Sequence, residues 1–137
     1  MLRTCTKFMA LLALAASSLT AVAASKVSVI TPYLAQPGTQ FYVEGFEAAA
    51  KDHDWEVNVI DTKGDVAAVI SRIEDAATQN VDAIVINVDP AQIAAGLAAA
   101  SDAGIPVVGM DSGSDPLLVT NVTSNCLLYT SPSPRDS

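Results

Sequence analysis

The sequence predicts an α/β fold built on a doubly wound parallel sheet. Short apolar runs rich in β-branched residues alternate with longer segments of helical periodicity, and this alternation is typical of βαβ units. The clearest case is a pair of strands (83–86 and 107–108) that flank a helix of small residues (91–103). A polar residue, Asn87 or Asp111, follows each strand. Ligands bind outside the carboxyl ends of the strands in open parallel sheets, so we expect both side chains at a binding site.

The first predicted strand covers residues 26–30, and the helix that follows runs from a cap at Thr39 to about Asp52. Thr suits the N-cap because its hydroxyl oxygen can accept a hydrogen bond from a backbone N–H of the first turn. Apolar residues at helical spacing define the face that we expect against the sheet. These are Tyr42, Phe46, Ala49 and Ala50.

A second strand comprises Trp55 and residues 57–60, and it leaves Asp61 at its carboxyl end. Asp65 then caps a second helix, which extends to Asn80. The apolar residues of this helix recur at helical spacing and should face the sheet. They are Val66, Val69, Ile70, Ile73 and Ala77.

The third helix has clear start and stop signals. Asp89 can act as its N-cap, and Pro90 suits the first helical position because its missing N–H has no partner there. Gly104 ends the helix, and a fifth strand is expected at residues 117–122. Right-handed crossovers between adjacent elements then favour the strand order 2-1-3-4-5 of a Rossmann-like domain.

Residues 1–24 have the features of a signal peptide. Arg3 and Lys7 precede an apolar core at 8–16, and small residues at 21–23 match a signal peptidase site. The core is shorter than the roughly 18 to 20 apolar residues that span a bilayer. We expect cleavage after Ala23 or Ala24 and export to the periplasm.

Residues 126–137 follow neither a helical nor a strand pattern. This segment, CLLYTSPSPRDS, resembles the in-frame translation of a transposase-based sequencing adapter. We therefore expect it not to be protein-coding in origin, the alternative being a natural flexible terminus rich in Ser and Pro. The predicted folded domain is then residues 25–125.

Composition excludes several functions for residues 25–125. The chain carries a formal net charge of −8, and the only basic residues of this segment are Lys26, Lys51, Lys63 and Arg72. A nucleic-acid-binding surface needs a basic patch, so we expect no nucleic-acid partner. No metal-ligand cluster, no glycine-rich nucleotide loop after the first strand and no nucleophile with a base occur here. We therefore expect no metal, no cofactor and no enzyme activity.

Hydrogen-bonding side chains cluster instead at the predicted strand ends. Such groups suit a sugar or polyol, because each hydroxyl both donates and accepts a hydrogen bond and a carboxylate or amide can pair two hydroxyls. Ligand contact is the favoured role for Asn87 and Asp111, whereas Thr31 and Asp61 could equally cap turns. The full set is Thr31, Gln36, Asp61, Asn87, Asp111, Ser112 and Ser124, with Tyr33, Phe41 and Tyr42 as nearby aromatic residues.

These features together resemble the ribose-type periplasmic binding proteins, which are the type I solute receptors of ABC sugar importers. The resemblance covers residues 26–125. Its most specific parts are Gly45 with Phe46 and the Ala triplet after Glu47, the turn at 61–65, the segment IED at 73–75, the segments VDAIVIN at 81–87 and AGIPVV at 103–108, Asp111, and VTSN at 122–125.

The resemblance assigns ligand contacts to Asn87, Asp111 and Ser124. The chain departs from the family pattern at two places. Family members often have Asn-Pro followed by two aromatics where this chain has Gln36-Pro37-Gly38-Thr39, and they usually have Arg at the position of Ser112. The predicted ligand-binding set is therefore Gln36, Phe41, Asn87, Asp111, Ser112 and Ser124.

The resemblance also implies the biological role. We expect the N-terminal domain of a two-domain receptor, a monomer when full length, which delivers a sugar or related polyol to ABC permease subunits in the inner membrane. This chain supplies one wall of the ligand cleft, so we expect it to bind ligand very poorly alone. A sensory receptor for chemotaxis or kinase signalling is the alternative; a regulator's effector domain and an exported enzyme fit the sequence less well.

Overall fold

The computed structural model describes residues 24–123. The predicted signal peptidase site at Ala23, the ligand residue Ser124 and the tail at 126–137 lie outside the described residues. No helix among residues 24–123 is long and apolar enough to cross a membrane.

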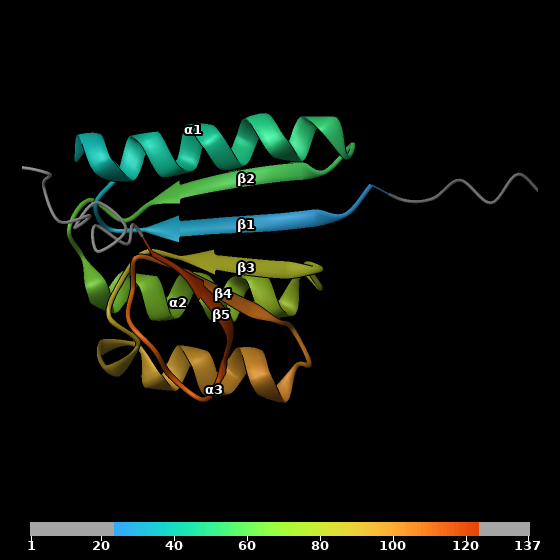
Figure 1. The fold of residues 1–137 in the computed structure, drawn as a ribbon. Coiled ribbons are helices and arrows are strands. Elements are labelled where there is room, and N and C mark those ends of the chain that lie inside the picture. The colour runs from blue at the N-terminus through green and yellow to red at the C-terminus, as the bar shows by residue number, and fades with distance from the viewer. Residues whose placement is uncertain (1–23, 124–137) are drawn as a thin grey trace, which may run out of the picture.

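The described residues form a five-stranded, fully parallel sheet in the order β2-β1-β3-β4-β5, as predicted (Figure 1). The elements in chain order are β1 (Lys26–Thr31), α1 (Pro37–Asp52), β2 (Glu56–Asp61), α2 (Val66–Thr78), β3 (Ala83–Ile86), the short 3-10 helix η1 (Pro90–Gln92), α3 (Ala94–Asp102), β4 (Val107–Met110) and β5 (Leu118–Val122). The predicted α/β fold class is thereby confirmed.

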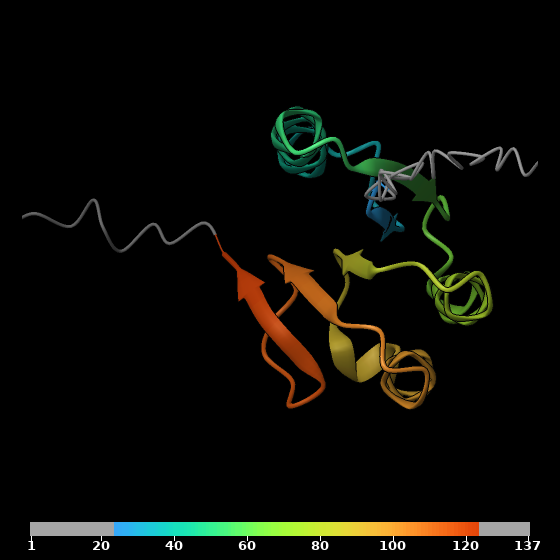
Figure 2. The same ribbon diagram turned by 90° about the vertical axis from the view of Figure 1, so that its right-hand side faces the viewer.

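Helices lie on both faces of the sheet, and each face has its own core. Figure 2 shows α1 on one side and α2 with α3 on the other. The larger core packs Ile30, Ile84 and Ile86 of the strands against Val69 and Ile73 of α2, together with residues of α3. The smaller core lies under α1 and contains Val27, Val29, Val43, Val85 and Met110. Alternate residues of β1 and β3 thus serve opposite cores, as expected for strands buried on both faces.

The prediction that Thr39 caps α1 is wrong. The helix begins at Pro37, with Gln36 as its N-cap, so Thr39 lies inside the first turn and is buried. Proline favours the first helical position because its fixed φ is helical and its missing N–H would have no partner there. The predicted packing face also differs from the observed one: Val43, which was not predicted there, is buried, whereas Ala49, which was, is exposed.

The caps at Asp65 and Asp89 form as predicted, but the helix after Asp89 is interrupted. Asp65 accepts a hydrogen bond from Ala68 N at 3.0 Å, and Asp89 accepts one from Ala91 N at 3.0 Å. The turn after Asp89 is a 3-10 helix that ends before α3 begins, rather than one helix over 91–103. Gly96 of α3 lies so close to α2 that an added Cβ would stand 3.1 Å from Ile73 Cδ1.

The two edges of the sheet differ slightly from the prediction. Trp55 precedes β2 instead of belonging to it, because the pairing of β2 with β1 begins at Glu56 opposite Lys26. β5 begins at Leu118 and pairs in parallel with β4. The loop that connects these two strands contains no helix. β5 is an exposed edge strand, and Val119 is 68% exposed.

Candidate functional site

A cleft of about 340 Å³ opens at the carboxyl ends of β1, β3 and β4. It lies between the loop after β1, the first turns of α1, and the loops after β3 and β4. Polar and aromatic side chains share its lining. The lining residues are Tyr33, Gln36, Gly38, Thr39, Tyr42, Asn87, Val88, Asp89, Asp111 and Ser112.

Asn87 lies at the floor of this cleft and links three elements. Its side-chain Oδ1 accepts hydrogen bonds from the hydroxyls of Thr39 in α1 (3.1 Å) and Thr31 in β1 (3.4 Å). Its Nδ2 donates to the carbonyl oxygen of Met110 in β4 (2.5 Å). Only 9% of Asn87 is exposed, so much of its hydrogen-bonding capacity is used within the protein. The remaining Nδ2 hydrogen is the part of the amide that a ligand could use.

Thr31 lies beneath the cleft surface. It is fully buried, and its hydroxyl oxygen also accepts a hydrogen bond from Tyr33 N at 3.0 Å. Thr31 therefore fixes the loop that carries Tyr33 and Gln36 into the cleft. The sequence left open whether Thr31 contacts a ligand or caps a turn, and its burial and hydrogen bond favour the structural role.

The cleft has two exposed anionic residues: Asp89, which accepts a hydrogen bond from Ala91 N, and Asp111. The φ of 50° of Asp111 puts it in the left-handed region, which is uncommon for residues other than glycine, and its N–H donates to Val122 O at 2.7 Å. The carboxylate of Asp111 accepts no hydrogen bond from residues 24–123. Ser112 follows it at the cleft wall and is buried.

The structure separates Phe41 from the other predicted ligand residues. Gln36, Asn87, Asp111 and Ser112 all line the cleft, whereas Phe41 does not and is 77% exposed. The aromatic surface of the cleft comes instead from Tyr33 and Tyr42, the two tyrosines that the sequence indicated as nearby. The ring of Phe41 lies 6.4 Å from that of Tyr42, in an edge-to-face arrangement.

Asp61 also lies away from the cleft, at the carboxyl end of β2. Its carboxylate accepts a hydrogen bond from Lys63 N at 2.8 Å, so it caps the turn that leads to α2. Thr39 and Asp89 also line the cleft, although their sequence context predicts only helix caps. Pro37 was the signal that could have placed Thr39 in the first turn, facing Asn87.

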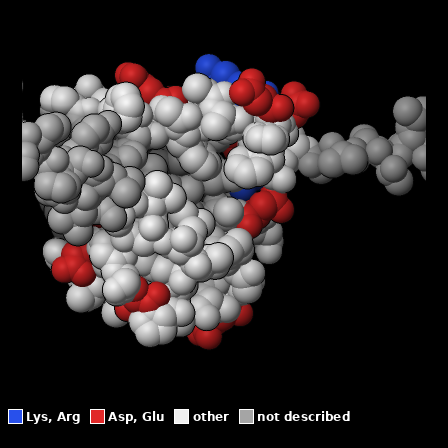
Figure 3. Space-filling view, in the orientation of Figure 1, with Lys and Arg blue, Asp and Glu red and all other residues white. Residues whose placement is uncertain are grey.

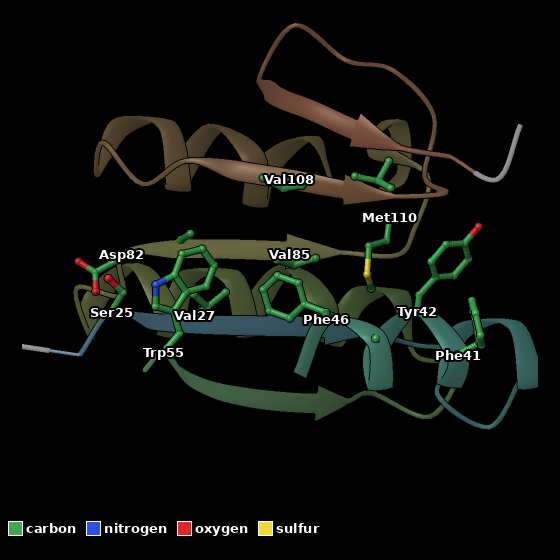
Figure 4. A pocket seen from close by; sticks show the side chains of 13 residues that line it. Ser25, Val27, Phe41, Tyr42, Phe46, Trp55, Asp82, Val85, Val108 and Met110 are labelled. Carbon is green, nitrogen blue, oxygen red and sulfur yellow. The ribbon is translucent and has the colours of Figure 1, made fainter. Parts of the chain in front are cut away.

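A second, larger hollow lies on the face of the sheet beside α1. It has a volume of about 640 Å³ and is lined almost entirely by apolar side chains. Figure 4 shows Trp55 and Phe46 over Val27 and Val85, with Val108 and Met110 opposite them. We call this hollow the apolar groove. It lacks the convergent polar groups of a sugar site, so the cleft is the better candidate.

The face of the molecule shown in Figure 3 is acidic at its edges and uncharged over much of its area. In Figure 3 the acidic side chains lie around the rim of the molecule, and basic ones are few. Residues 24–123 contain no group of three or more His, Cys, Asp or Glu side chains that could hold a metal ion. The cleft offers a ligand hydrogen-bonding groups and the two carboxylates of Asp89 and Asp111.

Comparison with known proteins gives a consistent result. A family model described as "Periplasmic binding protein domain" matches residues 27–137. Among curated proteins, no significant match is found.

Three solved structures illustrate the likeness. A 5-methylthioribose transporter solute binding protein from Thermotoga lettingae, in complex with 5-methylthioribose, is 26% identical and has a TM-score of 0.67. The match covers 75% of this chain and 33% of that protein's chain. An ABC transporter solute binding protein from Mycobacterium smegmatis, with bound glycerol, is 27% identical and has a TM-score of 0.66. The match covers 72% of this chain and 35% of that protein's chain. A carbohydrate transporter from Acidothermus cellulolyticus, in complex with myo-inositol, is 29% identical and has a TM-score of 0.56. The match covers 66% of this chain and 32% of that protein's chain. This chain thus spans about a third of the length of these structures.

Proposed function

Because this chain belongs to the family of periplasmic binding protein domains, we propose that its cleft forms one wall of a binding site for a sugar or related polyol. The observation that carries the proposal is the carboxylate of Asp111. It stands in a cleft with two tyrosines and accepts no hydrogen bond from the described part of the chain.

The chemistry of the cleft suits a polyol. A free carboxylate can accept hydrogen bonds from two neighbouring hydroxyls, and such charge-assisted bonds are stronger than neutral ones. Tyr33 and Tyr42 offer ring faces for the apolar side of a sugar and phenolic groups for its hydroxyls. Gln36 adds an exposed amide, which both donates and accepts. Similar structures from other bacteria hold 5-methylthioribose, glycerol and myo-inositol, which agrees with this ligand class.

The biological role follows from the same family. We infer that the chain is exported to the periplasm, where it acts within the substrate-binding component of an ABC transporter and passes its ligand unchanged to the permease. The opposite wall of the site would come from the part of the relatives' length that this chain does not span. Closure of two domains around a ligand is a known mode of switching.

Calorimetry on the complete open reading frame that contains this segment tests the proposal. The titrants are pentoses, hexoses, glycerol and inositols. Asp111→Ala should weaken the binding of the best ligand by about 10- to 100-fold, because a hydrogen bond to a charged group contributes about 1.5–3 kcal/mol. Asp102→Ala is the matched control, since it removes an equal charge from the exposed end of α3. Equal effects of the two substitutions, or no binding of any titrant, would contradict the proposal.

A further inference from the structure

The loop that carries Asp111 and Ser112 is anchored by a residue of the neighbouring strand. In the pairing of β4 with β5, Gly109 stands opposite Asn121 and Met110 stands opposite Val122. Gly109 and Asn121 therefore lie side by side on the same face of the sheet. Asn121 is partly buried and lines neither the cleft nor the apolar groove.

One atom of Asn121 accepts two hydrogen bonds from Ser112. Ser112 N donates to Asn121 Oδ1 at 3.3 Å, and Ser112 Oγ donates to the same oxygen at 3.2 Å. Asp111 N donates separately to Val122 O at 2.7 Å, so the two loop residues are tied to two successive residues of β5. Within residues 24–123, the N–H of Ser112 bonds only to the side chain of Asn121, whereas the N–H of Asp111 bonds to the strand backbone.

Gly109 makes room for this arrangement. A Cβ at position 109 would stand 2.6 Å from Asn121 Oδ1 and would overlap Ser112 Oγ. The space left by the missing side chain of Gly109 is where the side chains of Ser112 and Asn121 meet.

The anchor acts on a strained residue. A left-handed φ costs a non-glycine residue free energy, so such a conformation persists only where the surroundings enforce it. Asp111 has this conformation, with a φ of 50°, and it is the residue that points the exposed carboxylate at the cleft. Hydrogen bonds from the two backbone N–H groups that flank its Cα, those of Asp111 and Ser112, therefore define where the carboxylate stands.

We propose that Asn121 is a positioning residue of the ligand site, which sets the geometry of Asp111 by holding Ser112 through its side-chain oxygen. The inference rests on the proposed function, because it assumes that Asp111 contacts the ligand. Asn121 itself does not touch the cleft.

Two substitutions separate an acceptor role from a space-filling one. Asn121→Asp keeps the acceptor oxygen, whereas Asn121→Leu keeps the volume and removes the acceptor. Amide hydrogen exchange of the ¹⁵N-labelled chain is measured by NMR without any ligand. The Leu variant should speed exchange at Ser112 by about tenfold, the scale of one lost hydrogen bond, and the Asp variant should stay within about threefold of the parent.

The amide of Asp111 shows whether β4 and β5 remain paired, because its hydrogen bond to Val122 O involves no side chain of residue 121. Faster exchange at Ser112 in the Leu variant alone, with Asp111 protected in both, supports the proposal. If the Leu variant also exposes Asp111, the Asp variant decides: retained protection at Ser112 supports the acceptor role and lost protection overturns it. Unchanged protection of Ser112 in the Leu variant likewise overturns it.

Ligand affinity of the complete open reading frame gives the functional readout. Asn121→Leu should weaken binding of the best ligand by about tenfold, and Asn121→Asp should restore it to within about threefold. Equal affinities of the Leu variant and the parent would overturn the positioning role. A parent that binds no sugar or polyol would contradict the proposed function, but it would leave the exchange result at Ser112 standing, since that measurement uses no ligand.

Discussion

At the scale of single residues, the cleft depends on polar side chains that are satisfied inside the protein. Asn87 was predicted as a ligand contact, and it does line the cleft, but its amide also joins β1, α1 and β4. Such a network cannot be read from sequence, because Thr39 and Asn87 are 48 positions apart. The sequence could place polar residues at strand ends, yet it could not show which of them bond to one another.

Substitution of Asn87 should therefore lower stability as well as affinity. Asn87→Leu leaves the carbonyl of Met110 and two buried hydroxyls without this partner, and unpaired buried polar groups are costly. We expect the free energy of unfolding, measured in urea, to fall by about 2–3 kcal/mol. Asn58→Leu makes the same chemical change at an exposed position of β2 and should alter it by less than about 0.5 kcal/mol. Similar losses in the two variants would show that the network contributes nothing special.

Two glycines should respond in opposite directions to alanine. Gly109→Ala forces a Cβ against Ser112 and Asn121, and overpacking of this kind costs about 1–3 kcal/mol. Gly45 lies in α1, where a Cβ would meet nothing within 4 Å, so Gly45→Ala should raise stability by about 0.5–1 kcal/mol through helix propensity. Thermal unfolding of both variants measures the contrast. Stabilisation by Gly109→Ala would refute the close approach of β4 and β5 at this point.

At the scale of elements, most of the fold could be predicted from hydrophobic pattern and caps. The strand order and the caps at Asp65 and Asp89 follow from local signals that the structure confirms. The errors occur where a competing signal was stronger, as at α1, where Pro37 sets the helix start and moves Thr39 into the first turn. Asn121 was not predicted as part of the site, because its role depends on pairing with Gly109 rather than on its own sequence neighbours.

The start of α2 offers a test of the capping signal. Asp65→Ala removes the acceptor for Ala68 N and should destabilise the chain by about 1 kcal/mol. Asp75→Ala removes another carboxylate from the same helix. That carboxylate forms an exposed ion pair with Arg72 at 3.0 Å, so its loss should lower the free energy of unfolding by at most about 0.5 kcal/mol. Urea denaturation of the two variants gives the ranking. A larger loss for Asp75→Ala would reverse the assignment of the cap.

At the scale of the molecule, the described residues leave one face of the sheet partly open. Two helices cover one face, while α1 alone lies on the other, next to the apolar groove (Figure 2). The large exposed hydrophobic residues include Phe41 and Val122 at the groove, and an apolar surface of this kind promotes association with other molecules. The chain also spans about a third of the length of similar structures.

The apolar groove should bind hydrophobic dyes in the folded chain. Anilinonaphthalene sulfonate should show enhanced emission, and Phe41→Ser should reduce it, because this ring lines the groove while being mostly exposed. Leu117→Ser removes an exposed apolar side chain that does not line the groove, and it should leave the emission nearly unchanged. Equal decreases in the two variants would mean that the dye binds elsewhere.

The most direct test of the proposed function is to locate the bound ligand. Amide shifts of the ¹⁵N-labelled protein from the complete open reading frame, recorded with and without its best sugar or polyol ligand, give this location. We expect the largest shifts within residues 24–123 at Gly38, Asp111 and Ser112, which line the cleft at the strand ends. Largest shifts at Ser25, Trp55 and Asp82, which line the apolar groove at the opposite end of the sheet, would show that the cleft is not the ligand site.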